Sequence, residues 1–402
     1  MDKLAIHGGT PVRDDFLVYG APDIGEEELR EVVECLKSGW LSTGPRAARL
    51  EHDILTYTGA EYAVATNSCT AALHLSLLAA GVGPGDEVIT TPLTFGATAN
   101  VIEHVGARPV LADIAKDTFL IDPEAIEEQI TEQTKAIIPV HFAGSPCDMD
   151  AINTIARKHS IPVIEDAAHA LGAKYGGRMI GDGTNLTCFS FYVTKNIAAG
   201  EGGMLTTNDS ERADLMRCYG LHGMSRGAWQ RYTSTNSDLH YDIVYPGYKY
   251  NMPDIAASVA LQQLAKLEGF IARRREYADM YFDLLKDQDA LILPTSLRPQ
   301  SHSIRCAWHL YPVMVRLEQL KCSRDEIMRA LIKENIGVAT HFRALFEQPY
   351  YRDKYRLRGD TYPNAKFVSD RVFSIPLSTK ISRQDIQGVV TALNKVLSYY
   401  ST

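Results

Sequence analysis

The segment FSFYVTKNIAAGEGGM, residues 189–204, decides the fold of this chain. An apolar run ends at Phe191, Lys195 follows shortly after it, and a glycine-rich turn leads into the next apolar run. A lysine between a buried strand and such a turn can enter a partly desolvated pocket, where its amine becomes nucleophilic. Taken alone, Lys195 would be interpreted as a solvated surface lysine, because most lysines are solvated. The surrounding segments decide between these two interpretations.

Short β-rich runs alternate with helical patterns between residues 60 and 210. These runs are bounded by Gly, Pro, Asn or Asp and are almost continuously apolar, which is typical of strands buried on both faces. The alternation predicts an α/β fold in which helices cover both faces of a mainly parallel seven-stranded sheet. The expected strands are residues 61–66, 86–92, 108–114, 135–142, 162–168, 186–191 and 203–207.

The pattern changes after about residue 290 to an alternation typical of a small α+β domain. A long amphipathic stretch that begins near residue 254 predicts a helix that bridges the two parts of the chain. We therefore expect a large domain with an N-terminal segment at residues 1–265. The bridging helix and a small C-terminal domain are expected at residues 266–402.

Polar residues follow several of the expected strands, at the edge where ligands bind in open α/β sheets. Residues 67–72, NSCTAA, follow one strand and open a helix, so their free N–H groups and the helix dipole suit a phosphate. Simple capping of the helix by Ser68 or Thr70 explains the same segment equally well.

Asp166 ends the very apolar segment PVIEDAA, and a buried carboxylate is costly unless a cation meets it. The protonated pyridine nitrogen of pyridoxal phosphate (PLP) is such a cation, and PLP needs this partner to accept electrons. A structural role, in capping a helix or pairing with an arginine, is the alternative. His169 suits the phenolic oxygen of PLP or a polar gap, and Phe95 suits the ring face or the core.

The ordered combination of these segments resembles the DegT/StrS family of PLP-dependent nucleotide-sugar aminotransferases over essentially the whole chain. The resemblance implies the PLP-dependent transferase fold type I, as in aspartate aminotransferase. It is closest to members that make a UDP-linked 4-amino sugar with glutamate as amino donor. The motifs that carry the resemblance are GWLSTGP (39–45), GDEVITTPLTF (85–95), KAIIPVHFAG (135–144), VIEDAAHALG (163–172), the lysine segment and PGYKYNMPDI (246–255).

The resemblance implies a role for each matching residue. Lys195 is expected to bind PLP as a Schiff base and to transfer protons, with Asp166 at the pyridine nitrogen, His169 near the phenolic oxygen and Phe95 over the ring. The phosphate would be bound by Cys69, Thr70 and Ser190, with Lys249 or Asn251 reaching in from the other subunit of a homodimer. The substrates would be L-glutamate and a nucleotide-linked keto sugar, contacted by Thr43, Tyr192, His341 and Arg343.

Two departures from the family pattern lie on the substrate side. Tyr192 stands where the family often has histidine, and the segment after Thr-Pro is Thr94-Phe95-Gly96. The sugar therefore stays open, and a cyclitol or a 3-keto nucleotide sugar is the alternative acceptor. A noncatalytic regulatory homologue is the other alternative. The lysine at position 195 favours amino transfer over dehydration, because relatives that dehydrate carry histidine there.

Composition excludes several classes of partner. The net charge of −8 argues against bulk affinity for nucleic acid or anionic membranes, so the basic residues 272–275 are expected on a solvated or ion-pairing helix face. No apolar run approaches the roughly 18 residues of a membrane span, which favours a cytoplasmic protein.

The seven cysteines are scattered, as reduced thiols would be. Only His302, Cys306 and His309 loosely suggest a metal cluster, and we expect none.

Overall fold

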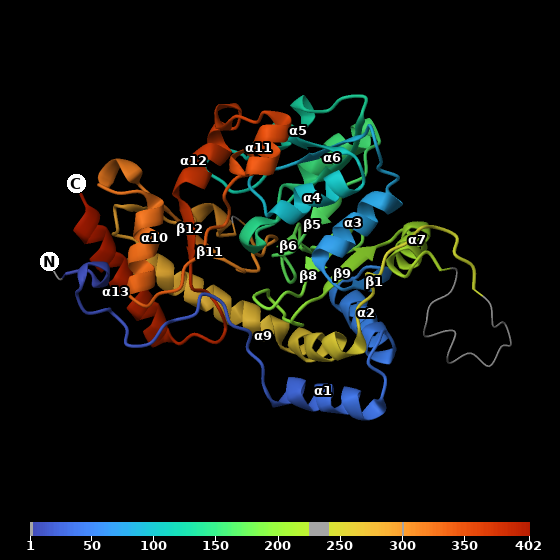
Figure 1. Cartoon of the computed structure of the whole chain (residues 1–402), viewed down its shortest axis with the longest axis horizontal. Helices are drawn as coiled ribbons and strands as arrows, with labels where there is room; N and C mark the ends of the chain where they lie inside the picture. Colours follow the sequence, from blue (N-terminus) through green and yellow to red (C-terminus); the bar gives the residue numbers. More distant parts are fainter. Residues whose placement is uncertain (1–2, 225–240, 300) are drawn as a thin grey trace.

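The computed structural model describes residues 3–224, 241–299 and 301–402. Its helices alternate with strands in the first half of the chain and dominate the second half (Figure 1). The helices are α1 (Glu26–Ser38), α2 (Pro45–Thr58), α3 (Cys69–Ala79), α4 (Gly96–His104), α5 (Pro123–Glu128), α6 (Met149–His159), α7 (Ser210–Gly220), α9 (Asp254–Leu285), α10 (Arg324–Lys333), α11 (Pro349–Tyr355), α12 (Pro363–Arg371) and α13 (Arg383–Tyr400).

The central sheet contains all of the expected strands. They are β1 (Tyr62–Thr66), β2 (Glu87–Thr90), β3 (Arg108–Leu111), β4 (Thr134–Ile138), β5 (Ile164–Asp166), β8 (Leu186–Ser190) and β9 (Gly203–Thr207). The order β3-β2-β4 continues into β5-β8-β9-β1, because Ile137 pairs with Val163 and Val140 with Asp166. Apart from β9, which runs antiparallel to both neighbours, the pairing is parallel. The predicted mainly parallel sheet is confirmed.

Helices cover both faces of this sheet because successive strand residues point to opposite sides. On β1, Val64 packs toward α3 and α7, whereas Ala63 and Ala65 pack toward α2 and α9. On β4, Ile137 packs toward α5 and α6, whereas Ala136 faces the α3 side. The strands are therefore buried on both faces, as their continuous apolar character predicts.

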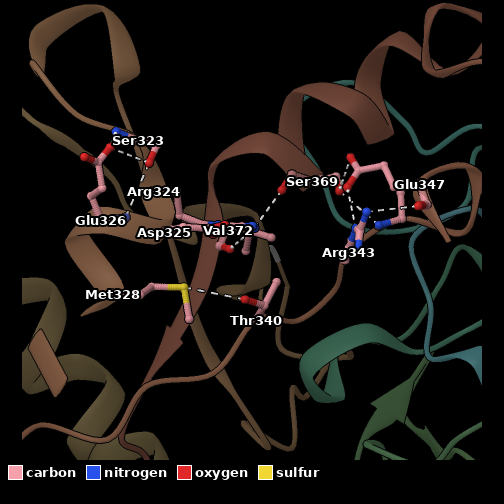
Figure 2. A network of polar contacts seen from close by, with 11 residues as sticks. Ser323, Arg324, Asp325, Glu326, Met328, Thr340, Arg343, Glu347, Ser369 and Val372 are labelled. Carbon is pink, nitrogen blue, oxygen red and sulfur yellow. Dashed lines mark hydrogen bonds and ion pairs between the residues drawn. The ribbon is translucent and has the colours of Figure 1, made fainter. Parts of the chain in front are cut away.

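The C-terminal part has a second hydrophobic core. It is built on α9, whose 32 residues run from the central sheet to this core (Figure 1). Three antiparallel strands, β10 (Leu291–Ile292), β11 (Tyr311–Val315) and β12 (Val372–Ile375), pack with α10 and α13 to form an α+β unit. Ser323 caps α10 in a capping box with Glu326 (Figure 2). The domain boundary at residue 265 stays a prediction, and α9 passes through it without a break.

The N-terminal segment packs on this C-terminal unit. The buried carboxylate of Glu334 accepts the N–H groups of Ala5 and Val12 and forms an ion pair with Lys395. Leu17 then pairs with Ile336. Tyr19 follows two residues later and lines the cavity described below.

Candidate active site

A cavity of about 470 Å³ opens at the carboxyl ends of β2, β5 and β8. It brings together most of the residues that the sequence predicts for the site: Cys69, Thr70, Phe95, Asp166, His169, Ser190, Tyr192, Lys195 and His341. A wider hollow of about 820 Å³ lies at the opposite ends of the strands, around Arg157, and contains none of these residues. The position of the smaller cavity is where ligands bind in open α/β sheets.

The turn between β1 and α3 forms one end of the cavity. Ser68 caps α3, and its Oγ accepts the N–H of Ala71 at 3.1 Å. The capping role is therefore real, yet it leaves the N–H groups of Cys69 and Thr70 in the first turn without intrahelical acceptors. Gly203 of β9 lies against this turn so closely that a Cβ there would stand 2.6 Å from the Cys69 nitrogen. The turn thus presents two N–H groups at a helix N-terminus beside the cavity, an arrangement that suits an anion.

Asp166 presents a buried carboxylate at the end of β5. Its Oδ2 accepts the hydroxyl of Thr98 at 2.8 Å, and its Oδ1 accepts the N–H of Ala168 at 3.2 Å. Burial raises the pKa of Asp166, against these hydrogen bonds and the nearby charge of Lys195. A cationic ring nitrogen within the cavity would offset that cost. The site therefore fits a protonated pyridine.

Lys195 follows β8 and lines the same cavity. Its N–H donates to the carbonyl of Tyr192 at 2.8 Å, which closes a turn before the glycine-rich segment. Burial lowers the pKa of Lys195 to about 8, against the opposing charges of Cys69 and Asp166. A large fraction of the amine is therefore neutral and nucleophilic near pH 8. The sequence-based expectation of a partly desolvated lysine agrees with this geometry.

His169 lies in the cavity wall beside two aromatic rings. Its Nδ1 accepts the N–H of Ala143 at 3.3 Å, and its ring centroid is 4.4 Å from that of His309 and 5.9 Å from that of Phe342. Burial, together with the charge of Lys195, holds the pKa of His169 well below its usual range. His169 is therefore a neutral side chain that can donate a hydrogen bond through Nε2.

Phe95 precedes the first turn of α4 and lines the mouth of the cavity. Two thirds of its surface is exposed, at 66%, so it is not a core residue. Its ring lies 6.2 Å from Phe342, centroid to centroid. An exposed aromatic ring at this position can cover a flat ring. The alternative interpretation, that Phe95 packs in the core, is wrong.

Four predicted residues lie away from this cavity. Thr43 and Asn251 are hydrogen-bonded to each other in a groove beside α2 and α7, and Lys249 is exposed nearby. Arg343 turns toward Glu347, with Nε 3.2 Å from Oε2 (Figure 2), and does not line the cavity. The chain therefore does not bring these four side chains to its own site, and their predicted roles stay predictions.

Thr98 of α4 was missed by the sequence analysis: its hydroxyl donates to Asp166, although Thr98 does not itself line the cavity. It stands four positions after Thr94, which does line the cavity, and their hydroxyl oxygens are 2.8 Å apart. That helical spacing after the Thr-Pro motif was the available signal. Tyr19, His309 and Phe342 also line the cavity, but they arrive from distant segments. No local pattern marks them.

The remaining expectations concern metals, thiols and basic residues. Among the described residues, no group of three His, Cys, Asp or Glu side chains is arranged to bind a metal ion. All seven cysteines are free. Arg274 is buried and donates to the carbonyls of Trp308, His309 and Leu377, so the expectation of a solvated or ion-pairing face is wrong for this residue.

Comparison with known proteins decides the family. The model of the DegT/DnrJ/EryC1/StrS aminotransferase family matches residues 22–394. The chain belongs to this family. It is 47% identical over 386 residues to the spore coat polysaccharide biosynthesis protein SpsC of Bacillus subtilis, covering 96% of this chain and 98% of that protein.

Solved structures agree with this assignment. The PMP form of the putative sugar aminotransferase Spr1654 from Streptococcus pneumoniae superposes with a TM-score of 0.88 at 34% identity, covering 95% of this chain and 99% of that one. The aminotransferase PseC of Helicobacter pylori, involved in the biosynthesis of pseudoaminic acid, gives 0.87 at 27% identity, with 96% and 100% covered. This member of the DegT/DnrJ/EryC1/StrS family is a PLP-dependent aminotransferase of fold type I. In the described parts of the chain, helices with the length and apolarity of a membrane span are absent.

Proposed function

We propose that this aminotransferase moves the amino group of L-glutamate to a nucleotide-linked keto sugar, at carbon 4 of a UDP- or dTDP-linked substrate. The observation that carries the proposal is the single cavity in which Lys195, Asp166 and the first turn of α3 meet. A solved relative, DesI, is described in the presence of its TDP-sugar product, with 28% identity and a TM-score of 0.85. The roles of SpsC in spore coat polysaccharide biosynthesis and of PseC in the biosynthesis of pseudoaminic acid support a sugar acceptor.

The cavity residues divide the binding of the cofactor among them. When bound, PLP supplies an electron sink for the carbanion that forms when the donor loses its α-proton. Asp166 would bind the pyridine nitrogen, and Cys69, Thr70 and Ser190 would bind the phosphate at the start of α3. Phe95 would cover one face of the ring, and His169 would donate to the phenolic oxygen.

Lys195 would move the proton. Its amine is partly neutral near pH 8, so it can remove the proton from the α-carbon of the donor. In the second half of the reaction, the same amine would give a proton to the sugar carbon that receives the nitrogen. One side chain therefore serves both halves of the reaction, which requires that donor and acceptor occupy the same cavity in turn.

The acceptor would enter beside the exposed side chains of Tyr192 and Phe95. Tyr192 is 44% exposed at the rim, and His341 reaches the cavity from the segment before α11. The cavity would therefore be open beside these residues. A small amino acid would not need this opening to enter or to fit. A nucleotide-linked sugar can place its keto carbon near Lys195 while its nucleotide stays outside.

A test of the acceptor uses the enzyme converted to its amino form with L-glutamate. We expect UDP- or dTDP-linked 4-keto sugars to restore the absorption of the PLP form in stoichiometric amounts, with a 4-amino sugar as product by mass spectrometry and NMR. The matched panel contains the corresponding 3-keto nucleotide sugars and keto cyclitols. If a 3-keto sugar or a cyclitol restored the absorption of the PLP form faster, the assignment of carbon 4 as the reacting position would be wrong.

We also propose a homodimer with shared sites, because Lys249 is exposed beside the α3 turn while Asn67 donates to its carbonyl at 3.3 Å. Its side chain would reach the phosphate in the partner's cavity. Lys195→Ala and Lys249→Ala should each be inactive or impaired as homodimers, yet a refolded mixture should regain wild-type activity up to half the fraction of mixed dimers, because each mixed dimer has one intact site of two. No regain in verified mixed dimers would place Lys249 outside the partner's site.

A further inference from the structure

A chain of contacts links His169 to the C-terminal part of the molecule through His309. The N–H of Ala143 donates to Nδ1 of His169, and the carbonyl of Ala143 accepts the N–H of His309 at 2.9 Å. On the other side, Nη1 of Arg274 donates to the carbonyl of His309 at 3.2 Å. The backbone of His309 is therefore bonded on both sides.

Backbone conformation at this junction is unusual. Ala143 and Trp308 are both buried and both left-handed, with φ of 56° and 48°, which costs free energy for residues with a Cβ. Gly144 completes the junction, because a Cβ there would stand 2.9 Å from the carbonyl oxygen of His169. Such strain persists where the surrounding contacts fix a functional geometry.

The side chain of His309 contributes a ring rather than a hydrogen bond. It is 5% exposed, and its Nδ1 has no hydrogen-bond partner within the described ranges. Its ring centroid lies 4.4 Å from that of His169 at an interplanar angle of 40°, and the Phe342 centroid lies 5.9 Å from that of His169 at 17°. The imidazole of His169 thus packs against two rings.

The bond from Ala143 determines which nitrogen of His169 carries the proton. An Nδ1 that accepts a backbone N–H is unprotonated, so the proton of the neutral ring is on Nε2. We propose that His309 is a positioning residue, whose ring holds His169 in the orientation that keeps Nδ1 on Ala143 and offers Nε2–H to the cavity. This inference rests on the proposed role of His169 toward the phenolic oxygen of PLP.

The charged and titratable groups around this pair favour the neutral state. Lys195 and His341 face His169, and Arg274 approaches His309 from α9. Burial and these neighbours hold the pKa values of His169 and His309 well below the usual range. Removing the His309 ring would admit water and loosen His169, so the pKa of His169 should rise toward its ordinary value.

The experiment compares His309→Ala with His309→Phe, which keeps a flat ring and removes the unpartnered nitrogen. His302→Ala is the control, because His302 is exposed in the same segment. Long-range proton–nitrogen NMR of apo protein with ¹⁵N-labelled histidine reports the proton position and pKa of each ring. The His169 signal is assigned by its loss in His169→Asn.

In the wild type we expect His169 to be protonated on Nε2 alone from pH 6 to 9. His309→Ala should give a mixture of both neutral forms and raise the pKa of His169 by about one unit or more. The dissociation constant of PLP should also rise about tenfold, the loss of one hydrogen bond to a charged group. His309→Phe and His302→Ala should match the wild type in both measurements.

Two results would overturn the proposal: a wild-type His169 protonated on Nδ1, or a His309→Ala variant with the wild-type proton position and pKa. Both are measured without cofactor or sugar, so they are independent of the amino-transfer proposal. If His309→Ala does not fold, a changed proton position in His309→Phe contradicts the ring role. A failure of amino transfer with the expected NMR result would instead contradict the proposed function.

Discussion

Two walls of the cavity differ in origin and in chemistry. The strand-end wall consists of Cys69, Thr70, Asp166, Ser190 and Lys195, which lie at or shortly after the ends of β1, β5 and β8. The C-terminal wall consists of His309, His341 and Phe342. The first wall carries the charged and phosphate-binding groups, whereas the second is aromatic, and burial lowers the pKa of His341 to about 3.

The two walls are also held in different ways. The strand-end wall follows from sheet topology, which places the carboxyl ends of parallel strands at one edge. The C-terminal wall depends on contacts between distant segments, such as the N–H of Leu345 donating to the carbonyl of Pro92. Tyr351 on α11 donates to Asn100 on α4 and strengthens the same junction. We infer that the first wall carries the chemistry and the second orients and desolvates it.

The largest effect is expected from Lys195→Ala. Without the amine, the protein loses both its covalent attachment to the cofactor and its proton-transfer group, so turnover should fall by about 10³-fold or more. Steady-state rates with L-glutamate and the best keto sugar give the number. Lys286→Ala, a change at an exposed lysine of α9's C-cap, should retain wild-type turnover. A Lys195→Ala enzyme within tenfold of the wild type would contradict the assignment of the amine.

A smaller loss is expected from Asp166→Asn, which keeps the size of the side chain and removes its charge. Turnover should fall by about 10²-fold, because the pyridine nitrogen would lose its charged partner. Thr98→Val removes only the hydroxyl that donates to Oδ2 and should cost about tenfold. Absorption spectra of the bound cofactor measure the protonation of the ring in each variant. The order would be refuted by a Thr98→Val loss that exceeds that of Asp166→Asn.

The reactivity of the Lys195 amine should depend on pH. Because burial lowers its pKa to about 8, the neutral amine should increase about tenfold per pH unit below pH 8 and level off above it. Competitive labelling of apo protein with an amine reagent, followed by peptide mass analysis, measures this profile at Lys195. Labelling that continues to rise tenfold per unit from pH 8 to 10 would indicate a solvated lysine.

The smallest effect is expected from Arg343→Ala. This side chain forms an exposed ion pair with Glu347 (Figure 2) and belongs to neither wall of the cavity. Exposed ion pairs contribute about 0–1 kcal/mol, so kcat and KM for the sugar should stay within about threefold of the wild type. A tenfold increase in KM for the sugar would instead show that Arg343 binds substrate, here or in a partner's cavity.

The sequence predicts the strand-end wall and not the C-terminal wall, for a physical reason. Asp166 and Lys195 stand at fixed offsets from apolar runs, so the position of each follows once the sheet is recognised. His309 acquires its position from the left-handed Ala143 and from Arg274 of α9, which both bond its backbone and which no local pattern encodes. Arg274 shows the same limit, since its burial depends on three distant carbonyls.

The most direct test of the central claim is borohydride reduction of the cofactor-loaded protein, followed by peptide mapping. We expect one pyridoxyl group per chain, on Lys195 in the segment at residues 189–204. Prior conversion to the amino form with L-glutamate should prevent the labelling. An unmodified Lys195 in fully loaded protein, or a pyridoxyl group on another lysine, would show that Lys195 does not bind the cofactor covalently.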